Sequence, residues 1–391
     1  MPVIDAITAF HEDMVRWRHD LHAHPETAFE ERRTADMVAT RLKSFGLEVD
    51  RGLAGTGVVG TLHHGHGPAI ALRADMDALP MTEANSFAHR STQPGRMHAC
   101  GHDGHTAMLL GAARYLAATR HFQGTVHFVF QPAEEGEGGG KQMVEDGLFR
   151  RFPAHAVYGM HNWPGLEVGR FAVRPGPMMA AFDIFEITIT GKGSHGAMPH
   201  QGIDPIVCGA AIVSALQAVV SRFTDPLHPA VVSVTRFHAG EAWNAIPDRA
   251  VLAGTARALG NEVRDATEAL VRRIAAATAE AYGADAEVRY EQRYPATVNH
   301  AAEVERAARA AALVVGAEHV DRDPVPSMGA EDFAYMLLER PGAYIWIGNG
   351  ATDGGRHLHS PHYDFNDAIL PIGASYWAKL AESVLAENRA E

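Results

Sequence analysis

The sequence contains only two cysteines, Cys100 and Cys208, among 391 residues. One possible pair cannot form a disulfide framework for a chain of this length, so each cysteine needs its own explanation. Cys208 lies among apolar residues of an expected helix, which predicts a buried core position. Cys100 lies in the polar segment HACGHDGH and is a candidate for chemistry.

Positive charge is also scarce, since 34 Lys and Arg residues face 47 Asp and Glu residues for a net charge of −13. This balance argues against nucleic acid or an anionic membrane as a partner and favours a small polar substrate. The amino terminus lacks the apolar run of a signal peptide, and we expect no window long and apolar enough for a membrane helix. The sequence therefore predicts a cytoplasmic protein, and its length leaves room for two domains.

The first part of the chain alternates helical and extended patterns. A buried strand at 125–130 leads into the acidic segment QPAEEGEGGG, and a second strand at 156–163 ends in polar residues. Such alternation predicts a layered α/β domain, and open α/β sheets bind ligands beyond the carboxyl ends of their strands. The helices are expected at residues 4–24, 30–45 and 102–119, with Gly46 as a left-handed cap after the second.

The pattern changes near residue 180. Between about 181 and 295 the order is strand, helix, strand, strand, helix, strand, which is the ferredoxin-like βαββαβ unit. We therefore expect an inserted second domain at residues 181–295, and a first domain formed by residues 1–180 and 296–391.

Side chains that bind metals are scattered over four segments of the first domain. Thiolate, imidazole and carboxylate together suit a transition ion such as Zn²⁺ or Mn²⁺. Where two carboxylates are adjacent, one can hold the metal while the other takes a proton from the attacking water. The candidates are Cys100, His102, Glu134, Glu135, His161 and His359.

Each segment also has a simpler interpretation. CGHDGH could be a helix start in which Cys100 is a small buried hydrophobe and Asp103 a cap, and EEGEGGG could be a solvated loop. Taken singly, His161 and His359 resemble ordinary surface or hydrogen-bonded core histidines, because the chain contains 24 histidines. The other clustered histidines are expected to be exposed: His19, His22, His24, His63, His64 and His66.

Seven segments, in order from one end of the chain to the other, resemble the M20 metallopeptidase superfamily. The similar branch is the amidohydrolase group, which includes hippurate hydrolases, N-acyl-L-amino acid amidohydrolases and indole-acetyl-amino acid hydrolases. The segments are RADMDALP at 73–80, HACGHDGHTAMLLGAA at 98–113, FQPAEEGEGGG at 130–140, GKGSHGAMPH at 191–200, NAIPD at 244–248, GAEDFAYM at 329–336 and LHSPHYDFND at 358–367.

The resemblance implies a zinc-peptidase-like catalytic domain interrupted by a ferredoxin-like lid that often dimerises, and hence a homodimer or dimer-based oligomer. It implies one or two divalent metal ions, Mn²⁺ or Zn²⁺ with Co²⁺ or Ni²⁺ as alternatives, and Glu134 as general base. The implied ligands are Cys100, His102, Glu135, His161 and His359.

Three further roles come from the resemblance alone. Asp77 matches a carboxylate that orients a metal ligand. His195 matches a lid histidine that reaches the substrate carbonyl oxygen, in its own site or in the partner's, and Asn244 matches a lid residue that contacts substrate. Many superfamily peptidases have a histidine two residues before the carboxylate that Asp77 matches, and an aspartate that bridges two metals. Here Asp75 and the pair Cys100 and His102 occupy the corresponding regions, so the number and identity of the metals stay open.

The predicted reaction is hydrolysis of the amide bond of N-acyl amino acids, either hippurate-like or N-acetylated, to a carboxylic acid and a free amino acid. One alternative is a dipeptidase or aminopeptidase of the same superfamily. Another is a non-catalytic metal- or ligand-binding module, against which the spare carboxylate Glu134 counts.

Overall fold

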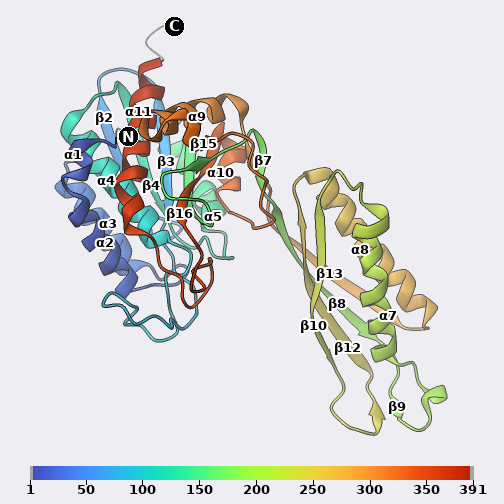
Figure 1. Ribbon diagram of the computed structural model, residues 1–391. Helices are drawn as coiled ribbons and strands as arrows, with labels where there is room; N and C mark the ends of the chain where they lie inside the picture. Colours follow the sequence, from blue (N-terminus) through green and yellow to red (C-terminus); the bar gives the residue numbers. More distant parts are fainter. Residues whose placement is uncertain (1–2, 388–391) are drawn as a thin grey trace. The chain divides into compact units, whose positions relative to one another are not determined.

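The computed structural model describes residues 3–387, which divide into two compact units (Figure 1). The large unit comprises the chain up to Met178, Val298–Val325 and the chain from Asp332 onward. The small unit comprises Met179–Thr297 and Pro326–Glu331.

The large unit contains an eight-stranded mixed sheet in the order β1-β2-β4-β3-β5-β16-β6-β15. Strands β4, β3, β5 and β16 run parallel to their neighbours within this set, so their carboxyl ends meet at one edge. Strands β2 and β3, although consecutive in sequence, do not pair, because β4 lies between them. The strands are β1 (Glu48–Leu53), β2 (Gly57–His64), β3 (Ala69–Asp75), β4 (Gly124–Gln131), β5 (Ala156–Pro164), β6 (Phe171–Ala172), β15 (Val320–Asp321) and β16 (Gly342–Gly350).

Helix α4 (His102–Thr119) is the central helix of the large unit. Most of its residues are buried, including Met108, Leu109 and Leu110, so it is enclosed by apolar neighbours rather than amphipathic. It packs against α2 and α11, which fixes the position of its first turn. The other helices are α1 (Asp5–Thr8), α2 (His11–Ala23), α3 (Arg32–Ser44), α5 (Gly139–Glu145), α6 (Leu148–Arg151), α9 (Ala301–Val315), α10 (Ala334–Glu339) and α11 (Leu370–Glu387).

The predicted helix at 4–24 is two helices, because the chain breaks at Ala9 and Phe10 between α1 and α2. The predicted cap Gly46 follows α3 with a φ of +86°, the left-handed conformation expected there.

The small unit has an antiparallel sheet in the order β10-β12-β8-β13 and two long helices, and its elements follow the order βαββαβ. Figure 1 shows α7 and α8 side by side on one face of this sheet. Strand β8 alternates buried and half-buried residues, as a strand does when one face is covered. The elements are β8 (Ala181–Thr190), α7 (Pro205–Ala218), β10 (Ala230–Ala239), β12 (Arg249–Ala258), α8 (Asn261–Ala281) and β13 (Asp285–Tyr294).

One expectation about hydrophobic runs is wrong. Pro205–Phe223, which is α7 with its π-helical continuation, is long and apolar enough to cross a membrane by length and composition, and only 28% of this window is buried. The run arises because small and apolar residues occupy the outer side of α7 as well as the inner side. Its inner side packs Cys208, Ile212 and Leu216 into the core of the small unit, which confirms the buried position predicted for Cys208.

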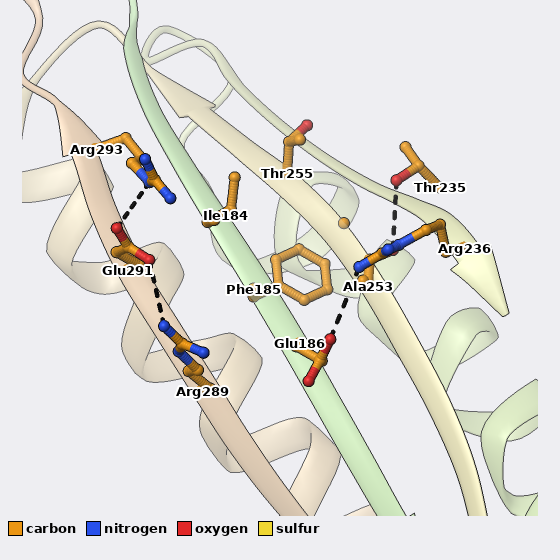
Figure 2. A pocket seen from close by; sticks show the side chains of 11 residues that line it. Ile184, Phe185, Glu186, Thr235, Arg236, Ala253, Thr255, Arg289, Glu291 and Arg293 are labelled. Atoms are coloured by element: carbon orange, nitrogen blue, oxygen red, sulfur yellow. Dashed lines mark hydrogen bonds and ion pairs between the residues drawn. The ribbon is translucent and has the colours of Figure 1, made fainter. Parts of the chain in front are cut away.

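The other face of the small unit's sheet carries a hollow of about 370 Å³ (Figure 2). Its three arginines are matched by carboxylates: Glu291 lies 2.7 Å from Arg293 and 3.9 Å from Arg289, and Glu186 lies 3.7 Å from Arg236. No histidine or cysteine is among the residues that line it, so the hollow lacks the imidazole and thiolate ligands of a transition-metal site.

Candidate metal centre and active site

The six candidate side chains come together at the carboxyl edge of the large unit's sheet. In the first group, ligand atoms of Cys100, His102 and His161 all lie within 4.8 Å of one another. In the second group, those of Cys100, Glu135 and His359 do so. The two groups share Cys100, so the geometry provides two neighbouring three-ligand sets that meet at one sulfur.

Unsatisfied polar atoms mark the space between these side chains. His102 Nε2 and Glu135 Oε1 are buried and have no hydrogen-bond partner among the described residues, although buried polar atoms almost always have one. The two atoms lie 4.0 Å apart, and Glu135 Oε1 lies 3.2 Å from His359 Nε2. A divalent cation between them would satisfy both atoms, so the residues present fit a metal.

The electrostatic environment of the ligands agrees with this fit. Burial and the nearby carboxylates of Glu135 and Glu134 raise the pKa of the Cys100 thiol, so its thiolate form needs a cation beside it. Burial and the neighbouring His105 lower the pKa of His161, which keeps its imidazole neutral, the form that binds metals.

Asp77 holds two of the candidate ligands at once. Its Oδ1 lies 3.3 Å from His102 Nδ1, its backbone oxygen lies 2.9 Å from the same nitrogen, and its Oδ2 accepts a hydrogen bond from the Glu135 backbone N–H. Burial lowers the pKa of His102, but Asp75 and Asp77 outweigh burial and raise it to about 10, so a metal cation that binds at Nε2 must displace a proton from this ring. With Nδ1 facing Asp77, the Nε2 atom of His102 is directed to the centre.

Glu134 is buried beside Glu135 and lies in a third group with His102. The preceding residue, Ala133, has a φ of +55°, a strained conformation for a residue with a Cβ atom. Its backbone N–H donates to Glu31 Oε1 at 2.9 Å. Glu31 thus holds the strained turn that presents the two carboxylates, and burial raises the pKa of Glu31 to about 7. Sequence reasoning missed Glu31, because a glutamate just before a helix is ordinary.

A second buried layer lies behind the ligands. Asp75 Oδ1 lies 2.6 Å from His105 Nδ1, and His105 Nε2 lies 2.7 Å from Asn162 Oδ1. Asn162 in turn donates to the Tyr363 hydroxyl at 2.7 Å. Arg73 donates to the other oxygen of Asp75 at 2.6 Å. Asp75, where many superfamily peptidases have a histidine, therefore belongs to a charged network beside the candidate ligands. The segment RAD could have indicated this network, because residues two apart in a strand share a face and Arg73 lies on the same face of β3 as Asp75.

The expectation that His22 is exposed is wrong. His22 is fully buried, with its ring between Asp103 and Glu83. Its charge is compensated by these carboxylates, which local sequence does not reveal. Asp103 does not cap α4; it accepts a hydrogen bond from His22. Of the other clustered histidines, His63 and His66 are exposed as expected, and His19, His24 and His64 are half-buried.

His195 and Asn244 lie in the small unit. Strand β9 (Ser194–His195) pairs with β11 (Ala245–Ile246), and the Asn244 backbone oxygen accepts a hydrogen bond from Gly196. The exposed His195 ring accepts a hydrogen bond at Nδ1 from the Ala197 backbone N–H at 3.1 Å. In neutral His195 the proton is therefore on Nε2, where it is available to a substrate.

A sequence model of peptidase family M20/M25/M40 matches residues 71–383 of the chain. The chain belongs to this family. Hippurate hydrolase from Campylobacter jejuni is 41% identical over 97% of this chain and 99% of its own length. N-acetylcysteine deacetylase from Bacillus subtilis is 41% identical over 96% of this chain and 98% of its own length.

A solved structure of a dinuclear metal-binding peptidase of the M20 family from Bacillus subtilis superposes with a TM-score of 0.85 and 37% identity. The superposition covers 97% of this chain and 99% of that protein. The M20 membership and the α/β fold class read from the sequence are thereby confirmed.

Proposed function

We propose that this M20 protein is a metal-dependent amidohydrolase that cleaves the amide bond of N-acyl amino acids to a carboxylic acid and a free amino acid. The observation that carries the proposal is the convergence of two three-ligand groups on Cys100, with the carboxylate of Glu134 beside them. Relatives similar over nearly their whole length are named for the hydrolysis of hippurate and the deacetylation of N-acetylcysteine, which are both N-acyl amino acids.

The centre would hold two divalent cations, bound by Cys100, His102, Glu135, His161 and His359. The dinuclear M20 structure from Bacillus subtilis supports this number. Mn²⁺ or Zn²⁺ suits this mixture of sulfur, nitrogen and oxygen ligands, with Co²⁺ and Ni²⁺ as further candidates. When bound, the metal supplies the Lewis acidity that activates water and polarises the scissile carbonyl.

Glu134 acts as the general base and then as the general acid. Its carboxylate accepts a proton from the attacking water and returns that proton to the nitrogen of the leaving amine. Asp77 accepts a hydrogen bond from the Glu135 backbone N–H and so keeps Glu135 in place. We assign metal binding to Glu135 and proton transfer to Glu134. The alternative function is that of a dipeptidase or aminopeptidase, whose substrates would be unblocked dipeptides.

His195 donates a hydrogen bond from Nε2 to the carbonyl oxygen as negative charge develops there. The hydrogen bond from Ala197 to its Nδ1 supports this role, because it directs the ring proton to Nε2. Asn244, which directly precedes β11 and whose backbone oxygen accepts a hydrogen bond from Gly196, contacts the substrate. His195 reaches the substrate through closure of the small unit as a lid or from the partner subunit.

The small unit also provides the surface for a homodimer. The outer side of α7 and the segment that follows expose apolar side chains, among them Val207 at 51% and Phe223 at 55%. A second copy of the chain would cover them, since large exposed apolar surfaces mark interaction sites. Light scattering coupled to size-exclusion chromatography tests whether the protein is a dimer. We expect the protein to be located in the cytoplasm.

Removal of metal tests the proposed reaction. Chelation should abolish hydrolysis of hippurate and N-acetyl amino acids, and Mn²⁺, Zn²⁺, Co²⁺ or Ni²⁺ should restore it. Unblocked dipeptides, assayed in parallel, should be poor substrates. Full activity of the metal-free protein would exclude the metal mechanism, and preference for dipeptides would favour the peptidase alternative. Metal binding without any turnover would favour a non-catalytic module.

A further inference from the structure

His22 lies near the end of α2, and no step of the proposed reaction uses it. Its Nδ1 lies 2.8 Å from Asp103 Oδ2, and its Nε2 lies 3.2 Å from Glu83 Oε1. An ionised carboxylate only accepts hydrogen bonds, so both ring nitrogens donate and the ring is an imidazolium. Burial lowers the pKa of His22, but the hydrogen bonds to Asp103 and Glu83 outweigh burial and raise it to about 9. His22 therefore links two carboxylates from separate segments.

The first of these carboxylates lies next to a proposed metal ligand. Asp103 follows His102 directly in the first turn of α4. Arg18, also on α2, places Nη1 3.8 Å from the same Asp103 oxygen. Asp77 sets the orientation of the His102 ring, whereas His22 and Arg18 hold the turn of backbone from which that ring projects. Movement of Asp103 would move His102.

The second carboxylate connects to the segment that follows His359. Glu83 Oε1 accepts a hydrogen bond from Asn85 Nδ2 at 2.9 Å. The same amide donates to the backbone oxygen of Tyr363 at 2.8 Å. Since Tyr363 lies four residues after His359 in the sequence, this connection restrains the loop that carries the outermost proposed ligand.

Arg18 ties the same loop to α2 directly. Its guanidinium donates to Asp364 Oδ1 at 3.0 Å, to the Phe365 backbone oxygen at 3.0 Å and to Asp367 Oδ1 at 2.8 Å. The two buried cations of α2 thus bind both ligand-bearing segments, one at the start of α4 and one after β16.

We propose that His22 is a positioning residue of the metal centre, which holds His102 and the His359 loop in the arrangement that the metal requires. The inference rests on the proposed metal ligands. A ligand set that is already in place loses less freedom when the metal binds, so removing the link should weaken metal binding. A buried ion pair with no positioning role would change the melting temperature alone.

The test uses the full chain and Zn²⁺ as the probe, in competition with a chelating dye. His22→Gln removes the positive charge and should weaken Zn²⁺ binding by about 10-fold or more, the scale for residues that support ligands. With Co²⁺ in place of Zn²⁺, the absorption band from the Cys100 thiolate should shift or lose intensity. A folded His22→Gln protein that binds Zn²⁺ within about twofold of wild type would overturn the positioning role.

A matched control separates positioning from general stability. Asp183→Asn disrupts the buried pair between Asp183 and Arg264 in the small unit, where Arg264 Nη2 lies 2.6 Å from the carboxylate. It should lower the melting temperature and leave Zn²⁺ affinity unchanged. Equal loss of Zn²⁺ affinity in this control and in His22→Gln would show that affinity follows stability, and would refute the inference.

Two more variants keep the result interpretable. Cys100→Ser tests the metal assignment itself, with the buried Cys208→Ser as its control: unchanged affinity in Cys100→Ser would refute that assignment. If Cys100→Ser weakens binding and His22→Gln does not, only the positioning role fails. If His22→Gln does not fold, Asp103→Ala removes the carboxylate that His22 Nδ1 contacts and leaves the ring paired with Glu83. Wild-type Zn²⁺ affinity in folded Asp103→Ala would then refute the proposal.

Discussion

Exchanging one carboxylate for an amide at two adjacent positions separates catalysis from metal binding. Glu134→Gln and Glu135→Gln change shape very little, but a glutamine cannot accept the proton of the attacking water. At Glu134 the loss of a general base should reduce kcat by about 10²- to 10⁴-fold. Metal content should stay at the wild-type level, because Glu134 is in neither of the two groups that meet at Cys100.

At Glu135 the same exchange removes a charged ligand. The Oε1 atom of Glu135 is buried, lies 3.2 Å from His359 Nε2 and lacks a hydrogen-bond partner among the described residues, so the cation is its natural counterpart. Losing an indirect support of a ligand already costs about 10- to 100-fold in metal affinity, so losing the ligand itself should cost at least as much.

The two variants are compared by metal analysis after dialysis and by single-turnover hydrolysis of hippurate at saturating metal. The expected result is a metal-replete, inactive Glu134→Gln protein and a metal-depleted Glu135→Gln protein. Asp332 donates its backbone N–H to Glu134 Oε1 at 3.4 Å, and the amide oxygen of a glutamine at this position can accept the same hydrogen bond. Equal metal loss in both variants would show that the roles are divided wrongly, and near-normal turnover in Glu134→Gln would remove the general base.

Two further predictions follow from His195 and His22. His195→Ala should lower kcat by about 10²-fold or more and leave the metal content unchanged. If His195 acts in the partner's site, mixing the His195→Ala and Glu134→Gln proteins should restore part of the activity. A fully active His195→Ala protein would refute the catalytic role. Because the folded pKa of His22 is raised from 6.5 to about 9, its stabilisation is complete below pH 6.5 and is lost as the pH rises through 9. Metal-free wild type should thus lose about 3 kcal/mol of unfolding free energy more than His22→Gln between pH 6.5 and 9.5, measured by urea denaturation; parallel pH profiles would contradict the raised pKa.

Much of the site could be predicted because its residue types are unusual in their settings. A cysteine just before a helix with a histidine at the helix's first position, two adjacent glutamates after a strand, and a histidine near a strand end each stand out. The parallel order of β4, β3 and β5 brings them to one edge of the sheet. The strands and long helices were equally readable, since buried strands and covered helices leave clear periodicities.

His195 and Asn244 illustrate the opposite case. Each lies in a short segment that contains glycine or proline and resembles a turn. Only the pairing of β9 with β11, which Asn244 directly precedes, and the hydrogen bond from Gly196 to the Asn244 backbone oxygen show that the chain holds the two segments together. Periodicity carries no signal for strands of two residues, so the roles proposed for His195 and Asn244 come only from the family resemblance.

The residues that support the site escaped prediction for a different reason. The partners of His22 lie 81 and 61 residues away from it in the sequence, so nothing local distinguishes it from an exposed helical histidine. A set of candidate metal ligands can be recognised from residue types that rarely occur together, whereas a buried charge is defined only by its counter-charge. Arg18 and His22 compensate the negative charge of Asp103, and Glu31 accepts the Ala133 backbone N–H next to the two candidate glutamates. These supporting residues can therefore be identified only from the folded structure, in which the charges are paired. Substituting them should alter metal binding, although none of them is a candidate ligand.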